Sequence, residues 1–114
     1  MKEASALYRL LGDEARLRLL RVLEKDRFNV KELTGILGLA QSGVSRHLGL
    51  LKDADLVSEE RDGAYTFYRL APRARDDGRS PLWPLLHAQF DAAAESPLVK
   101  ADEARLQEIG RAHV

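Results

Sequence analysis

The sequence predicts a mainly helical domain that carries a single two-stranded β-hairpin. Most of the chain shows apolar residues at helical spacing, in stretches that begin at a capping residue or end at a glycine. After Leu56 the spacing changes to alternation around an Asp62-Gly63 pair, which is a strong hairpin signal. The 114 residues allow one domain with a modest core.

Two helices are expected at the start of the chain. The first carries Leu7, Leu10 and Leu11 at helical spacing. It ends at Gly12, and Asp13 then serves as the N-cap of a second helix over residues 14–26. The second helix has a wide apolar stripe, formed by Leu17, Leu19, Leu20, Val22 and Leu23. It is expected to be well buried, with an exposed face formed by Arg16, Arg18 and Arg21.

A helix-turn-helix unit is expected next. Asn29 can cap a short helix over residues 30–38 that stops at Gly38, and another helix begins three residues later. The outer face of this helix is polar and basic, formed by Gln41, Ser42, Ser45, Arg46 and Lys52. It has no acidic residue before Asp53. In a helix-turn-helix the second helix lies in the DNA major groove, where acidic side chains would be repelled by the phosphates.

The hairpin follows this unit directly, in the position of a wing. Its two strands are expected within residues 57–70, and Gly63 tolerates the positive φ of a tight primed turn. The aromatic residues of the hairpin are expected to be core residues rather than a base-stacking platform: Tyr65, Phe67 and Tyr68. Arg61 is expected at the tip, where a wing reaches the neighbouring DNA backbone or minor groove.

The last third of the chain is predicted to contain a linker and two helices. Residues 71–81 have the composition of a loop, and Ser80 and Pro81 open the next helix. Its apolar residues are Leu82, Leu85, Leu86 and Phe90. This face has nothing left to cover in so small a body, so a partner chain is expected to cover it. Trp83 and Phe90 then either line an effector pocket at the dimer seam or anchor the interface.

Composition limits the classes of function. The chain has 18 basic and 18 acidic residues, so a nucleic-acid hypothesis must rest on where the charges lie. Cysteine is absent, which excludes disulfides, thiolate metal sites and a cysteine nucleophile. There is no secretory signal, and no apolar run approaches the roughly 20 residues of a membrane span. A cytoplasmic location is expected. No enzyme activity is predicted, because there is no glycine-rich phosphate loop and the three His are scattered.

Three segments resemble the ArsR/SmtB family of bacterial winged-helix repressors in their order and spacing, over roughly the first seventy residues. They are "DEARLRLLRVL", "VKELTGILGLAQSGVSRHLGLLKDADLV" and "RDGAYTFYRL". The resemblance implies a homodimer that pairs through its first and last long helices, binds an inverted-repeat operator and is released by an effector. It also implies recognition-helix contacts at Gln41, Ser42, Ser45, Arg46 and His47, with Arg61 as the wing contact.

The expected contacts divide into two kinds. Gln41, Ser42, Ser45 and Arg46 are expected to read base edges, whereas Lys52, His47 and Arg61 are expected to hold phosphates. For His47, packing between the helix and the wing is an equal alternative.

Two residues depart from the family pattern at the start of the recognition helix. Ala40 stands where the family usually has Ser or Thr, so the side-chain N-cap is missing, at a cost of about 1 kcal/mol of local stability. Gly43 replaces a usual Thr, which removes a hydroxyl and loosens the first turn. DNA binding is therefore expected to be weaker or more adaptable than is typical of the family.

No cofactor is predicted, and the effector is left unidentified. Founding members of the family bind metal through two cysteines at positions that look like Asn29 and Lys31 here, so that site is absent. Other members bind zinc or nickel between their paired last helices. His87, Asp91 and Glu95 follow one another at four-residue steps and could share one face, but this spacing departs from the family pattern. A solvated polar stripe is preferred over a metal site.

The sequence thus predicts a cytoplasmic, homodimeric and sequence-specific transcriptional repressor. Residues 1–96 would form the winged-helix DNA-binding and dimerisation domain, and residues 97–114 a C-terminal helix or tail of the same domain. One alternative is a winged-helix module for protein interaction. Another is the regulatory part of a methyltransferase fusion, because "SPLWPLLHAQF" and "DEARLQEIGRAHV" look similar to the segment that joins the two domains in such proteins.

Overall fold

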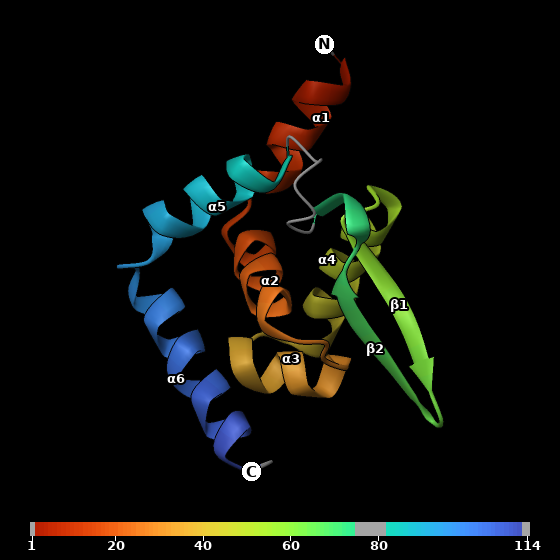
Figure 1. Cartoon of the computed structure of the whole chain (residues 1–114), viewed down its shortest axis with the longest axis vertical. Helices are drawn as coiled ribbons and strands as arrows, with labels where there is room; N and C mark the ends of the chain where they lie inside the picture. The colour runs from red at the N-terminus through yellow and green to blue at the C-terminus, as the bar shows by residue number, and fades with distance from the viewer. Residues whose placement is uncertain (1, 75–81, 113–114) are drawn as a thin grey trace.

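The computed structural model describes residues 2–74 and 82–112, and its arrangement is shown in Figure 1. In chain order its elements are α1 (Lys2–Leu11), α2 (Glu14–Lys25), α3 (Val30–Leu37), α4 (Gln41–Asp53), β1 (Val57–Asp62), β2 (Tyr65–Leu70), a short 3-10 helix (Pro72–Ala74), α5 (Leu82–Ala93) and α6 (Pro97–Ala112). α2 lies at the centre and contacts α1, α3, α4, α5, α6 and β2. The prediction of a mainly helical domain with one β-hairpin is confirmed.

Side chains cap α2 and α3 as predicted. Asp13 accepts a hydrogen bond from the backbone N–H of Arg16 at 3.2 Å. Asn29 and Glu32 form a reciprocal capping box at the start of α3, with bonds of 2.8 and 3.1 Å. Gly38 ends α3 in the left-handed conformation, at φ +65°, and its N–H donates to the carbonyl of Thr34. These local signals therefore fix the start of α2 and both ends of α3.

The hairpin is confirmed, but its turn lies one residue later than predicted. β1 and β2 pair antiparallel, and the last pair joins Asp62 to Tyr65. The loop therefore consists of Gly63 and Ala64 rather than Asp62 and Gly63. Gly63 still supplies the positive φ, at +63°, but as the first residue of the loop.

The base of the hairpin is fixed to the segment between α2 and α3. Phe28 forms an isolated antiparallel bridge with Tyr68, with backbone bonds of 3.0 and 2.8 Å. Tyr68 is partly buried against the core, as predicted, and Phe67 is partly buried below the Arg27 guanidinium, 4.2 Å from its ring centre. The prediction of a core position is wrong for Tyr65, which is 61% exposed because it directly follows the loop at the tip.

The prediction that the apolar face of α5 lacks a surface to cover within its own chain is wrong. Leu82, Leu86 and Phe90 are all buried in the core of this chain. α2 is apolar on several sides, so α5 packs against the side that α3, α4 and β2 leave open (Figure 1). The predicted loop over residues 75–81, including Ser80 and Pro81, lies outside the described residues.

The arginines of α2 do not form the predicted exposed face. Arg16 and Arg21 are partly buried, and Arg18 is only 5% exposed. For Arg18 and Arg21 the reason is α6, which packs along this side of α2 and pairs with both. Arg16 instead bonds to His47 of α4 and to the carbonyl of Leu10. Within residues 2–74 and 82–112, none of the helices has the length and hydrophobicity that crossing a bilayer requires.

Removing the side-chain cap of α3 and adding one to α4 should change the free energy of unfolding in opposite directions. Asn29→Ala removes the side-chain acceptor of the capping box, which caps the N–H of Glu32, and should lower the free energy of unfolding by about 1 kcal/mol. Ala40→Ser provides the side-chain acceptor that α4 lacks and should raise it by about 1 kcal/mol. Urea unfolding followed by circular dichroism measures both, and equal effects of the same sign would contradict this account of the caps.

Candidate nucleic-acid interface

α4 has one buried face and one exposed face. Its buried side chains are Val44, His47, Leu48 and Leu51, which lie three or four residues apart and pack toward α2, α3 and β1. The opposite face is exposed and carries Gln41, Ser42, Ser45 and Arg46. These four residues were predicted to contact base edges, and they occupy the first two turns of the helix.

The exposed face of α4 combines hydrogen-bond donors with unbalanced positive charge. Its first acidic residue is Asp53, the last residue of the helix. Among the described residues, no carboxylate forms an ion pair with Arg46. Ala40 provides no side-chain acceptor, so the first N–H groups of α4 stay available at the positive end of the helix dipole. This surface suits an anionic partner that accepts hydrogen bonds.

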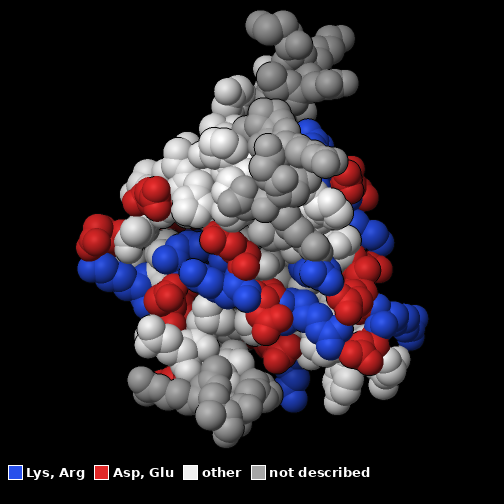
Figure 2. All heavy atoms as spheres, viewed as in Figure 1, with Lys and Arg blue, Asp and Glu red and all other residues white. Residues whose placement is uncertain are grey.

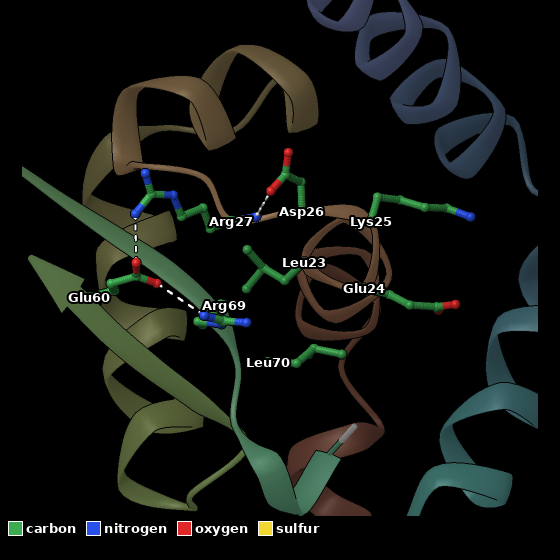
Figure 3. A pocket seen from close by; sticks show the side chains of 8 residues that line it. All are labelled: Leu23, Glu24, Lys25, Asp26, Arg27, Glu60, Arg69 and Leu70. Carbon is green, nitrogen blue, oxygen red and sulfur yellow. Dashed lines mark hydrogen bonds and ion pairs between the residues drawn. The ribbon is translucent and has the colours of Figure 1, made fainter. Parts of the chain in front are cut away.

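A different face of the molecule carries balanced charge. Figure 2 shows basic and acidic side chains interleaved across this face. Arg27, for example, bonds to Glu60 at 2.7 Å and to Asp62 at 2.8 Å, and Arg69 bonds to Glu60 at 3.2 Å. Arg27, Glu60 and Arg69 help to line a cavity of about 410 Å3 between the end of α2 and the hairpin (Figure 3). Both guanidinium groups of this cavity pair with Glu60, and its three basic residues are balanced by three acidic ones, so it offers phosphates no net attraction.

The two basic residues predicted at the edge of the interface differ in their surroundings. Arg61 is exposed on β1, one residue before the end of the strand, opposite Thr66. Lys52 lies at the end of α4 and forms an ion pair with Glu59 of β1 at 3.1 Å. The Lys52 ammonium is thus already balanced by a carboxylate, and the pair joins the recognition helix to the wing.

His47 does not lie on the exposed face of α4. Its side chain is 7% exposed, and its Nδ1 accepts a hydrogen bond from Nε of Arg16 at 3.2 Å. Burial lowers the pKa of His47 below its ordinary value; Asp13 opposes this effect, and the Arg16 and Arg46 charges add to it. His47 is therefore buried and bonded to α2, which leaves its imidazole no free surface for a phosphate.

Sequence reasoning missed Arg16 as the partner of His47. The two residues are 31 positions apart, and each has an ordinary place in its own helical pattern. No local signal connects them, because the contact depends on how α2 crosses α4. A histidine on the apolar side of the α4 pattern, next to Leu48, was the only available sign of its burial.

The three candidate metal ligands do not converge within the chain. His87 is exposed on α5, 3.7 Å from Glu24 and beside the Trp83 ring. Glu95 lies beyond the end of α5 and pairs with Lys100 at 2.8 Å, so the predicted common helix face with Asp91 is not formed. Across the described parts of the chain, no group of three or more His, Asp or Glu side chains is arranged to hold a metal ion. That the protein has no metal effector stays a prediction.

Comparison with known proteins gives matches over most of the chain. Residues 11–60 match a family described as a helix-turn-helix domain. The chain is 33% identical over 107 residues to the arsenic resistance transcriptional regulator ArsR1 of Pseudomonas putida, covering 91% of this chain and 77% of that protein. It is 35% identical over 94 residues to the biofilm growth-associated repressor of Agrobacterium fabrum, covering 82% and 77%. The crystal structure of the transcriptional repressor BigR from Xylella fastidiosa superimposes with a TM-score of 0.66 at 28% identity, covering 83% of this chain and 89% of that one.

The buried imidazole predicts an acid-sensitive fold. The folded state binds the His47 proton less readily than the unfolded chain does, so the unfolded state takes up more protons as the pH falls below the ordinary value of 6.5. The free energy of unfolding should therefore be highest above this pH and decline below it. Urea unfolding between about pH 5 and about pH 8 measures the decline.

Two variants assign that decline to one residue. His47→Gln should flatten the pH dependence in this range, because it removes the buried titrating group. His87→Gln is the control, since its imidazole is exposed and its removal should leave the decline in place. An unchanged pH dependence in His47→Gln would show that another group causes it.

Proposed function

Because the chain belongs to the ArsR/SmtB family of winged helix-turn-helix transcriptional regulators, we propose that it binds an inverted-repeat operator as a homodimer and represses transcription until an effector releases it. The chain is a DNA-binding transcriptional regulator, and its family is one of regulators rather than enzymes. The observation that supports the proposal best is the exposed, acid-free face of α4. A cytoplasmic location, where the operator would be accessible, is part of the proposal.

The residues on α4 match the chemistry of base edges in the major groove. The Arg46 guanidinium can donate two parallel hydrogen bonds to O6 and N7 of guanine. Gln41 can form a similar pair with adenine, and a serine hydroxyl can donate or accept. We assign Gln41, Ser42, Ser45 and Arg46 to this contact surface. All four are exposed on the two N-terminal turns, which is the part of a recognition helix that reaches the bases.

The wing would supply a backbone contact beside the recognition helix. Arg61 is exposed near the tip of the hairpin, where its charge can reach a phosphate or the minor groove. Two contacts keep the wing aligned with α4: the Phe28–Tyr68 bridge at its base and the Lys52–Glu59 ion pair along β1. We therefore reassign Lys52 from phosphate binding to holding the wing.

The second copy of the chain would cover α1. Tyr8 is 64% exposed on α1, which projects from one end of the body beside α5 (Figure 1). Tyr8 also lines a groove of about 220 Å3 with Leu11, Leu85 and Gln89. A large exposed aromatic residue beside an apolar groove favours burial against a partner. A symmetric dimer would present its two α4 helices to successive major grooves, about 34 Å apart.

Loss of the Arg46 side chain should reduce operator affinity without affecting the fold. Arg46→Ala should weaken binding to a duplex selected from a random library by about 1–3 kcal/mol. The free energy of unfolding should change by less than about 0.5 kcal/mol, because the side chain is exposed and forms no ion pair among the described residues. Fluorescence anisotropy measures the affinity, and urea unfolding measures the stability.

Lys52→Ala is the matched control for this prediction. Its ammonium is already paired with Glu59, so affinity should fall less than in Arg46→Ala. An equal loss of stability and affinity in Arg46→Ala would contradict the role of Arg46 in the interface. A binding constant that does not change with salt would instead favour a protein partner.

A charge placed on α1 should separate the dimer. Tyr8→Glu would bury a carboxylate in the proposed interface, so sedimentation should show a shift from dimer toward monomer. Tyr65→Glu is the control, because Tyr65 is exposed to a similar degree (61%) but lies on the wing. If both variants sediment like the original protein, α1 does not form the interface.

A further inference from the structure

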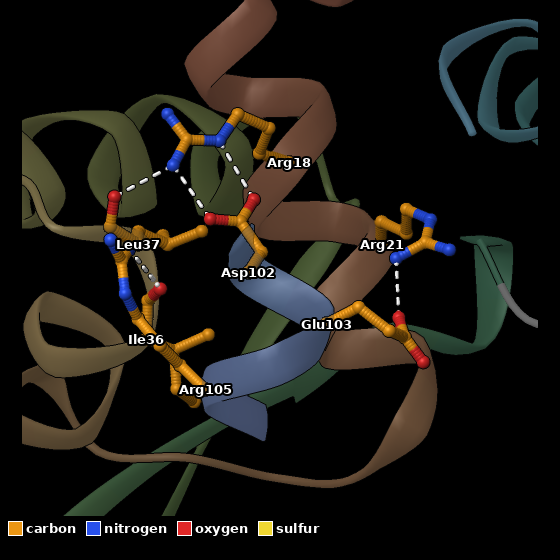
Figure 4. Close-up of polar contacts among 7 residues, drawn as sticks. All are labelled: Arg18, Arg21, Ile36, Leu37, Asp102, Glu103 and Arg105. Atoms are coloured by element: carbon orange, nitrogen blue, oxygen red, sulfur yellow. Dashed lines mark hydrogen bonds and ion pairs between the residues drawn. The ribbon is translucent and has the colours of Figure 1, made fainter. Parts of the chain in front are cut away.

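α6 is attached to α2 through a buried ion pair. Arg18 of α2 donates two hydrogen bonds to the Asp102 carboxylate, one from Nε at 2.8 Å and one from Nη2 at 2.7 Å (Figure 4). Arg18 is 5% exposed and Asp102 is 2% exposed. A pair joined by two parallel hydrogen bonds fixes the relative position of its two side chains. Because either charge left alone in this buried position would be strongly unfavourable, the pair holds α2 and α6 together.

The same cluster also reaches the end of α3. Nη2 of Arg18 donates to the carbonyl of Leu37 at 2.6 Å, and Nη1 of Arg105 donates to the carbonyl of Ile36 at 2.9 Å (Figure 4). Ile36 and Leu37 are the last two residues of α3, directly before Gly38. Carbonyls at this end of a helix lack intrahelical donors and lie at the negative end of the dipole. Two guanidinium groups satisfy them here.

Arg105 also lies against the turn that leads to α4. A Cβ atom placed on Gly38 would come within 3.0 Å of Nη1 of Arg105. Gly38 therefore serves two purposes: it adopts the left-handed conformation, and it leaves space for the guanidinium. Because α4 begins at Gln41, the position of Gly38 determines where the recognition helix starts relative to α3.

We propose that Asp102 and Arg105 of α6 are positioning residues for DNA recognition. Arg105 holds the end of α3 directly, and Asp102 holds it through Arg18. Together they keep the turn in one geometry and so present α4 in one orientation. The inference rests on the proposed function, because it requires that α4 read the operator. Sequence-specific affinity then depends on a helix that lies outside the helix-turn-helix.

A neighbouring ion pair separates this role from simple attachment of α6. Arg21 and Glu103 also join α2 to α6, with a bond of 2.8 Å, and both side chains are partly exposed. Figure 4 shows this pair apart from the carbonyls of Ile36 and Leu37. A variant at Glu103 weakens attachment without removing a bond to α3, so it is the matched control.

The test compares Arg105→Met with Glu103→Gln in the full chain. Arg105→Met keeps most of the aliphatic stem and removes the donors. The measured quantity is the ratio of dissociation constants for a scrambled duplex and a selected operator duplex, at several salt concentrations. Arg105→Met should lower this ratio by about threefold to thirtyfold. Glu103→Gln should keep it, and Arg105→Lys, which restores a charged donor, should recover part of it.

The salt dependence distinguishes positioning from direct contact with DNA. A positioning residue leaves the slope of log affinity against log salt unchanged, whereas the loss of one phosphate contact lowers it by about 1. Equal weakening on both duplexes with a lower slope would overturn the positioning role in favour of a phosphate contact. Equal effects of Arg105→Met and Glu103→Gln would overturn it in favour of simple attachment.

Two further outcomes keep the inference distinct from the proposed function. If the original protein binds both duplexes alike, recognition through α4 fails, and the positioning role fails with it. If the original protein discriminates and Arg105→Met discriminates equally well, only the positioning role fails. Should Arg105→Met lose its cooperative unfolding, Arg105→Lys carries the test: faster amide exchange at residues 38–42 than in Glu103→Gln supports positioning, and equal exchange overturns it.

Discussion

The constraint on which the structure depends is a cation buried at its centre. Arg18 lies on the central helix α2 and is almost inaccessible to water, so its charge needs a carboxylate and the second N–H of its Nη2 needs an acceptor. Asp102 of α6 provides the first and the Leu37 carbonyl of α3 provides the second. Replacing both partners of such a pair by apolar groups can be neutral for stability, whereas removing one costs about 3–5 kcal/mol. Its main consequence is therefore geometric: α2, α3 and α6 are held in one arrangement.

The distribution of charge explains how a chain with no net charge can carry a surface for an anion. Away from α4, acidic side chains neutralise many of the basic ones: Asp102, Glu103, Glu60 and Asp62 all take part in ion pairs. On α4 no acidic residue precedes Asp53, and Arg46 is exposed. A neutral composition is thus compatible with a local cationic surface, and attraction to phosphates depends on where the unpaired basic side chains lie.

The features that could be predicted from the sequence are those set by neighbouring residues. Asp13, Asn29 and Gly38 determine helix ends through contacts within four positions, and the apolar spacing of α4 predicts which of its faces is exposed. The predictions for Arg18 and His47 failed because the deciding contacts join distant residues. The burial of Arg18 depends on Asp102, 84 positions away, and that of His47 on how α2 crosses α4. A pattern of charges on one helix cannot show which partner another helix will bring.

The start of the recognition helix is weak in itself and depends on what precedes it. Ala40 gives α4 no side-chain cap, and Gly43 lowers its helical propensity although a Cβ atom added there would meet nothing within 4 Å. Packing therefore does not require glycine at that position. The preceding helix, in contrast, ends with two guanidinium groups on its final carbonyls and a glycine in the left-handed conformation. The turn between the two helices is thus held by side-chain and glycine contacts at the end of α3, whereas the start of α4 has no side-chain cap. In the proposed complex, a helix anchored in this way would adapt its first turn to the bases while its direction stays set by the body of the protein.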